Sequence, residues 1–123
     1  MKAVLDDGKS IFLQIAEAVE DDILAGAIAE EELIPSTNQF ARHYAINPAT
    51  AAKGVNLLVD EGIVYKKRGI GMSVKAGAKA LILAKRRRAF YQNYVASLVW
   101  EAAKLGIEKS ELIKMIEKGD SND

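Results

Sequence analysis

The first regular pattern in the chain is helical and covers residues 10–25. Apolar residues recur there every three or four positions, and acidic residues occupy the other faces. Ser10 is a suitable N-cap, and Gly26 ends the pattern. We therefore predict an amphipathic helix, followed by a loop over residues 27–33 that carries three consecutive glutamates.

Two short helices joined by a tight turn are predicted next. Ser36 and Gln39 match a capping box, in which each side chain accepts a hydrogen bond from the backbone N–H group of the other residue. This second helix ends near Ala45. Asn47 is a favoured N-cap and Pro48 a favoured first helical residue, so a third helix begins there.

The predicted third helix has two distinct faces and one unusual residue. Its core face is expected to consist of Ala51, Val55, Leu58 and Val59. Asn47, Thr50 and Lys53 recur every third residue on another face, and Gly62 ends the helix. Gly54 lies inside the helix, where glycine is about 1 kcal/mol less favourable than alanine. Close packing against another helix would explain this glycine.

A hairpin with a basic tip follows the third helix. Short strands are predicted over residues 63–67 and 72–75, and Gly69 and Gly71 supply the backbone freedom that a tight turn needs. The cations beside this turn are Lys66, Lys67 and Arg68. Such a tip can approach the minor groove or the phosphates of DNA. The alternative is that these cations only keep the tip of the hairpin soluble.

The C-terminal part of the chain is predicted to form a long helix over residues 78–105 and a short one over residues 109–118. The apolar stripe of the long helix consists of Phe90, Tyr91, Tyr94, Val95, Leu98, Val99 and Ala102. The short helix is expected to bury Leu112, Ile113 and Ile116. Helical spacing favours a core or a dimer interface over a ligand cage. Trp100 lies on a second, weakly apolar face, and this suggests self-association. The candidate dimerisation residues are Phe90, Tyr91, Tyr94, Val95, Leu98 and Trp100.

Together these elements predict a mainly α fold with a small β wing. The expected domains are a winged helix-turn-helix over residues 1–76 and a two-helix dimerisation tail over residues 77–123. In such a fold the first turns of the third helix present side chains to base edges. Those turns contain Asn47, Ala49, Thr50 and Lys53. The asparagine, threonine and lysine side chains can form hydrogen bonds with base edges, and lysine can also bind phosphate. If the two helices are considered without the wing, the alternative to a helix-turn-helix is an ordinary helical hairpin with a polar surface.

The net charge is zero, but the charges are unevenly distributed. Residues 1–34 hold two lysines against nine acids, whereas residues 35–76 hold six cations against two acids. A basic middle suits a polyanionic partner, although solvated charged faces would give the same balance. The basic run over residues 85–88 is either a solvated stretch or a partner for the acidic first helix of the same or another chain.

Several function classes are disfavoured by what the chain lacks. Cysteine is absent and His43 is the single histidine, so we expect no disulfide, no metal site and no cofactor. No nucleophile, base and orienting residue form a set, so an enzyme is not expected. No apolar run approaches the roughly 18 residues that span a bilayer, and the start does not resemble a signal peptide. These observations predict a cytoplasmic protein with no membrane partner.

Four segments between residues 13 and 74 carry a resemblance to a known family. They are LQIAEAVEDDILAGAI, IPSTNQFA, INPATAAKGVNLLVDEGIVY and KKRGIGMSV. In this combination the chain resembles the GntR family of bacterial transcription regulators, and its short tail and INPAT segment resemble the YtrA-like branch. The resemblance implies a homodimer that binds an inverted repeat in double-stranded operator DNA and often represses a nearby transporter operon. It specifies no small-molecule effector.

The same resemblance implies DNA contacts from the start of the second helix, from the recognition helix and from the wing. At those positions, with Lys67 added from the wing, this chain has Ser36, Asn38, Asn47, Pro48, Ala49, Thr50, Lys53, Lys67, Arg68, Gly69 and Gly71. Family members commonly carry an arginine where Asn38 stands and a polar or basic residue where Ile70 stands. A winged helix that serves only as a protein-interaction module, without specific DNA binding, is the alternative hypothesis.

Overall fold

The computed structural model describes residues 4–119, and its elements follow the predicted order. They are α1 (Ile11–Leu24), α2 (Thr37–Tyr44), α3 (Pro48–Asp60), β1 (Val64–Lys67), β2 (Gly71–Val74), α4 (Ala78–Phe90), the π-helical segment η1 (Tyr91–Val95), α5 (Ala96–Lys104) and α6 (Lys109–Gly119). The chain divides into two compact units, residues 1–84 and 85–123, and the division falls inside α4. The domain boundary expected at residue 76 stays a prediction.

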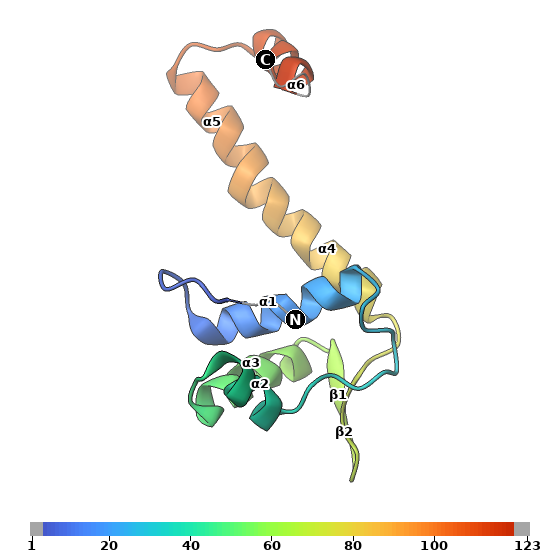
Figure 1. Cartoon of the computed structure of the whole chain (residues 1–123). Helices are drawn as coiled ribbons and strands as arrows, with labels where there is room; N and C mark the ends of the chain where they lie inside the picture. The colour runs from blue at the N-terminus through green and yellow to red at the C-terminus, as the bar shows by residue number, and fades with distance from the viewer. Residues whose placement is uncertain (1–3, 120–123) are drawn as a thin grey trace. The chain divides into compact units, whose positions relative to one another are not determined.

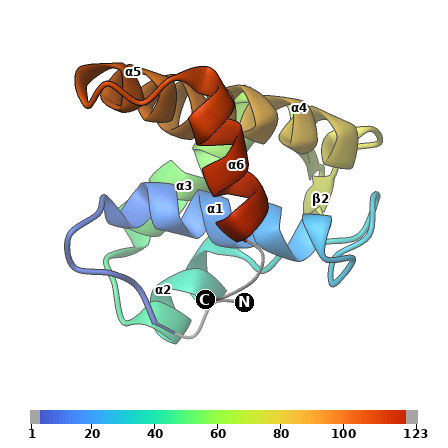
Figure 2. The same ribbon diagram turned by 90° about the horizontal axis from the view of Figure 1, so that it is seen from above.

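In the first unit, α1 packs along α3, and α2 packs against α3 (Figures 1 and 2). The apolar stripe predicted for α1 is buried at Ile15, Val19 and Ile23. Gly54 lies where α3 meets α1, and a Cβ atom there would be 2.7 Å from the carbonyl oxygen of Phe12. The close packing predicted from this glycine is therefore confirmed.

The turn between α2 and α3 is built from local caps, as predicted. The Ser36 hydroxyl accepts a hydrogen bond from the Gln39 N–H at 3.1 Å, and the Gln39 side chain accepts one from the Ser36 N–H at 2.7 Å. Ala45 ends α2 in the left-handed conformation, with φ of 53°. The Asn47 side chain then accepts a hydrogen bond from the Ala49 N–H at 2.8 Å and begins α3.

The strands β1 and β2 form an antiparallel hairpin in which Val64 pairs with Val74. A third segment pairs with the other edge of β2, because Leu33 forms a β-bridge with Ser73 and the Ile34 N–H donates to the Met72 carbonyl at 2.9 Å. Residues 27–33 are predicted to form a loop, and the pairing of Leu33 is a departure from that prediction. A single bridge is too short to show the alternation that identifies a strand.

The core of the first unit includes side chains from its helices, its hairpin and the start of α4. The largest fully buried apolar residues are Phe40, Ile15, Leu58, Ile63, Ile82, Val19, Val64 and Val74. Ala78 and Ile82 belong to α4 and join this core cluster. The first turns of α4 therefore stabilise the winged fold.

The second unit contains two departures from the prediction. The helix expected over residues 78–105 is interrupted by the π-helical segment η1, in which backbone hydrogen bonds skip one additional residue. Spacing of apolar residues does not reveal such a local widening. The predicted burial of Ile113 and Ile116 is wrong: they are 55% and 57% exposed, and α6 buries only Leu112. Among residues 4–119, no helix is long and apolar enough to cross a membrane.

Candidate nucleic-acid interface

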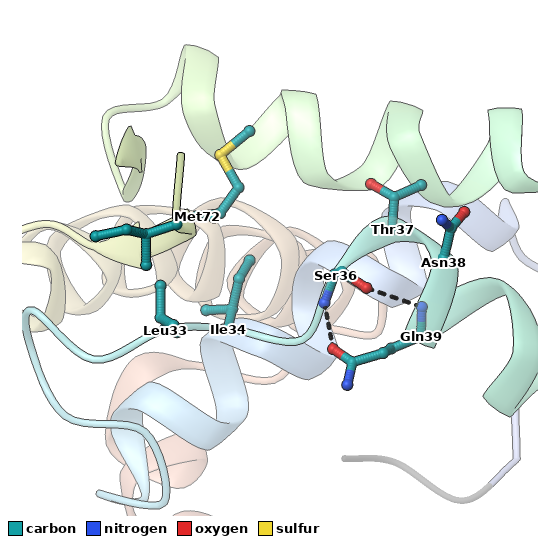
Figure 3. Close-up of a pocket in the computed structure, with 9 residues that line it drawn as sticks. Leu33, Ile34, Ser36, Thr37, Asn38, Gln39 and Met72 are labelled. Carbon is teal, nitrogen blue, oxygen red and sulfur yellow. Dashed lines mark hydrogen bonds between the residues drawn. The ribbon is translucent and has the colours of Figure 1, made fainter. Parts of the chain in front are cut away.

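The beginning of α2 presents polar groups to solvent. Its capping box engages Ser36 and Gln39 with each other, and Figure 3 shows Thr37 and Asn38 pointing away from that pair. The backbone N–H groups of Thr37 and Asn38 lie in the first helical turn, where no intrahelical acceptor exists. The positive end of the helix dipole adds to these groups, so this turn suits an anion such as a phosphate.

A hollow of about 400 Å³ lies between the beginning of α2 and the wing (Figure 3). Leu33, Ile34 and Met72 supply apolar side chains to it, and residues 36–39 supply the polar ones. Gly71 lines the same hollow. The structure therefore brings together three predicted DNA-contact residues from two distant segments, namely Ser36, Asn38 and Gly71.

The beginning of α3 exposes three of the predicted residues, Asn47, Pro48 and Ala49, and leaves Thr50 half-buried. The Asn47 side-chain oxygen Oδ1 accepts a hydrogen bond from the Ala49 N–H group, which leaves the side-chain NH₂ group as the remaining donor of this side chain. Lys53 is exposed, but its Nζ atom lies over the ring of Phe12 in α1, 4.2 Å from the ring centroid. Lys53 thus lies on the flank of α3 beside α1.

The tip of the wing is exposed and basic. Lys66, Arg68, Gly69 and Ile70 all face solvent, and the Ile70 N–H donates to the carbonyl of Lys67 at 2.9 Å across the turn. Gly69 has a φ of 78°, a value that side-chain-bearing residues rarely adopt. The predicted glycine turn is confirmed, and the positive φ, not a lack of space for a side chain, is what requires glycine at position 69.

Glu31 is the residue near the wing that sequence reasoning missed. Its Oε2 atom accepts a hydrogen bond of 2.6 Å from the Tyr65 hydroxyl and lies 3.9 Å from the Nζ atom of Lys67. The hydrogen bond to the Glu31 carboxylate is the main cause that raises the pKa of Tyr65 above its ordinary value. The signal available in the sequence was the pair Leu33 and Ile34 after three glutamates, which indicates a short extended segment.

Within residues 4–119, no three His, Cys, Asp or Glu side chains are placed to hold a metal ion. The exposed His43 ring packs edge-on against Tyr44, with the ring centroids 4.6 Å apart. The residues that line the hollow beside α2 include no titratable side chain.

The predicted dimerisation residues are mostly exposed in the single chain. Phe90, Tyr91, Tyr94 and Trp100 are each about 60% exposed or more, and Leu98 is also exposed, while Val95 is half-buried. The Phe90 and Tyr94 rings contact each other with their planes tilted by 45° and their centroids 5.5 Å apart, and the Lys104 Nζ atom lies 4.4 Å from the centroid of the Trp100 ring. Exposed aromatic side chains gathered on one segment of a helix are typical of an interaction site.

The family model described as bacterial regulatory proteins, gntR family, matches residues 12–74, which is half of the chain. The chain belongs to the GntR family. The match begins in α1 and ends in β2, so it contains the helix-turn-helix and the wing of this GntR protein. The predicted fold class, mainly α with a small β wing, is confirmed by the structure and by its solved neighbours.

Two relatives from Bacillus subtilis show how this GntR chain compares in length. It is 26% identical over 108 residues to the HTH-type transcriptional repressor YtrA, covering 88% of this chain and 82% of that protein. It is 28% identical over 75 residues to the HTH-type transcriptional regulator YurK, covering 59% of this chain but only 31% of YurK. The resemblance to the YtrA-like branch is therefore supported across most of the chain.

Two solved structures extend the comparison. A GntR-family transcriptional regulator from Bacteroides thetaiotaomicron is 37% identical, with a TM-score of 0.78, covering 91% of this chain and 97% of that one. The DNA-binding domain of AraR, solved in complex with operator ORX1, is 24% identical, with a TM-score of 0.51, covering 60% and 90%. The second likeness concerns the fold alone.

Proposed function

We propose that this GntR-family protein binds operator DNA as a homodimer and represses a nearby operon, such as one that encodes a transporter. Three observations support the proposal. The start of α2, the start of α3 and the basic wing tip are exposed within one unit, the chain belongs to a family of bacterial regulators, and a relative that covers most of the chain is named as a repressor.

The observation that carries the DNA-binding part is the juxtaposition of the α2 start and the wing around one hollow. The first-turn N–H groups of α2 would hold one phosphate, and Arg68 at the wing tip would contact a neighbouring phosphate or the minor groove. The exposed first turn of α3, with Asn47, Ala49 and Thr50, would then lie toward the major groove. Two such units would place their recognition helices about 34 Å apart on one face of the duplex.

Salt-dependent binding to the chain's own upstream DNA tests this proposal. We expect Arg68→Ala to weaken binding several-fold and to lower the salt slope by about one, because one phosphate contact is lost. Lys75→Ala is the matched control, since Lys75 is an exposed cation beyond the end of β2 and not at the tip. Equal effects of the two substitutions, or binding without sequence preference in a competition assay, would contradict the proposal and favour a protein-interaction module.

The homodimer is proposed to form through the exposed aromatic stripe around η1. Burial of these rings against a second copy would stabilise the dimer, because each aromatic side chain can bury a large apolar area. Tyr94→Glu should therefore shift the full-length protein toward a monomer in analytical ultracentrifugation. Ser110→Glu makes the same change of charge at an exposed polar position of α6 and should leave the mass unchanged. A Tyr94→Glu protein that keeps the mass of the parent would refute this interface.

A further inference from the structure

Glu31 joins the edge segment, residues 31–34, to the wing through four separate contacts. Its N–H donates to the Val74 carbonyl at 2.7 Å, and its carbonyl accepts from the Ser73 hydroxyl at 2.8 Å. Its carboxylate accepts from Tyr65 and lies beside Lys67. Each of these four partners belongs to β1 or β2.

The backbone of Glu31 is in a conformation that side-chain-bearing residues seldom adopt. Its φ is 70°, a left-handed value for which glycine and asparagine are the favoured residues. A glutamate held there indicates that the surrounding contacts outweigh the local cost. The side chain is therefore directed toward β1 by a backbone that β2 holds in place.

The two cations nearest to the wing turn differ in their surroundings. Arg68 is exposed at the tip, whereas Lys67 is half-buried and its ammonium lies 3.9 Å from the Glu31 carboxylate. Both side chains of this pair keep partial contact with water, with 37% of Lys67 and 53% of Glu31 exposed. An ion pair of this exposure is weak enough for a phosphate to replace the carboxylate.

We propose that Glu31 is a positioning residue of the wing that competes with DNA phosphate for Lys67 and so lowers the affinity for DNA. This inference rests on the proposed DNA-binding function. In the free protein the Glu31 carboxylate holds the ammonium group of Lys67 beside the hydroxyl of Tyr65. On binding, Lys67 must leave Glu31 before it can neutralise a phosphate, and the loss of this ion pair lowers the net gain from the phosphate contact.

The charge of Glu31 can be removed while its hydrogen-bonding shape is kept. Glu31→Gln retains an oxygen that accepts from Tyr65, and it should tighten DNA binding about two- to fivefold, the range expected for an exposed ion pair. Glu30→Gln is the matched control, because this substitution removes the same formal charge from the neighbouring residue. The Glu30 carboxylate accepts a hydrogen bond from the Gly77 N–H group at 3.0 Å and not from Tyr65. The control should change affinity less than Glu31→Gln does.

A double-mutant cycle with Lys67→Gln separates competition for Lys67 from a general effect of charge. The gain from Glu31→Gln should disappear when Lys67 is already neutral, and coupling of this kind measures the pairwise interaction. A gain that persists in the Lys67→Gln background, or one equal to that of Glu30→Gln, would overturn the proposal. Weaker binding by Glu31→Gln would overturn it as well.

A second measurement requires no DNA and keeps this inference separate from the proposed function. Glu31→Gln should lower the pKa of Tyr65 in the free protein, because the carboxylate that stabilises the neutral hydroxyl is gone. The Tyr65 transition is assigned by its loss in Tyr65→Phe during an absorbance titration. An unchanged Tyr65 titration would refute the positioning role, whereas absence of DNA binding by the parent protein would refute only the proposed function and the competition that rests on it.

Discussion

Gly54 offers the sharpest test of how α3 is held against α1. Substitution by alanine would place a Cβ atom 2.7 Å from the Phe12 carbonyl oxygen and 3.1 Å and 3.2 Å from the Ile15 Cβ and Cγ2 atoms. The carbonyl belongs to the backbone of α1 and the Ile15 side chain is fully buried, so neither can move without shifting the helix or the core. The two helices must therefore separate.

Two opposing terms set the magnitude. Overpacking of a core costs about 1–3 kcal/mol, and a backbone contact belongs in the upper part of that range. Alanine is favoured over glycine in a helix by about 1 kcal/mol, which offsets part of the cost. We therefore expect Gly54→Ala to lower the free energy of unfolding by about 1–2 kcal/mol.

Urea unfolding followed by circular dichroism, at one protein concentration, measures this change. The exposed Asn56 on the same helix provides the reference, because Asn56→Ala should be more stable than Asn56→Gly by about 1 kcal/mol. The order of alanine and glycine is thus expected to reverse between positions 54 and 56. A Gly54→Ala protein that equals or exceeds the parent in stability would show that the contact between α1 and α3 is not tight.

Two further predictions concern single side chains. The Tyr44 hydroxyl is buried and has no hydrogen-bond partner among residues 4–119, so Tyr44→Phe should unfold at the same or a higher urea concentration, and a loss above about 1 kcal/mol would contradict this. Burial is the main cause that raises the pKa of Tyr44 in the folded protein above its ordinary value. The stability contributed by the neutral Tyr44 hydroxyl is therefore fully present below the pKa of the unfolded chain, and it is lost as the pH rises through the pKa of the folded protein. Tyr44→Phe should accordingly lose less stability in alkaline solution. Ser36→Ala breaks the capping box and should lower the free energy of unfolding by about 0.5–2 kcal/mol, measured by thermal unfolding. An unchanged unfolding midpoint would mean that Gln39 and solvent alone satisfy the backbone N–H groups at the start of α2.

The elements that were predicted correctly depend on contacts between residues close in sequence. Ser36 with Gln39, and Asn47 with Pro48, identify helix starts because caps act within one turn of the chain. Gly69 predicted the wing turn because only a positive φ closes it. Gly54 went further, since its presence inside a helix predicted the close approach of a second helix that the structure then showed.

The errors and omissions concern contacts between distant residues. The bridge of Leu33 to Ser73 joins segments forty residues apart, and a single pair shows no periodicity. Ile113 and Ile116 follow a helical pattern, but a pattern states which residues share a face and not whether another surface covers it. The π-helical segment η1 changes hydrogen-bond spacing without changing the type of residue that forms it.

By itself the sequence determined the order of the elements, their starts and turns, and the family, because these follow from local caps, glycine conformations and motif spacing. Only the tertiary structure decided the electrostatic partners. It placed Glu31 beside Tyr65 and Lys67, and it turned Lys53 toward Phe12 on the flank of α3. A side chain's charge is a property of the sequence, whereas the group that the charge meets depends on how segments far apart in the chain are folded together.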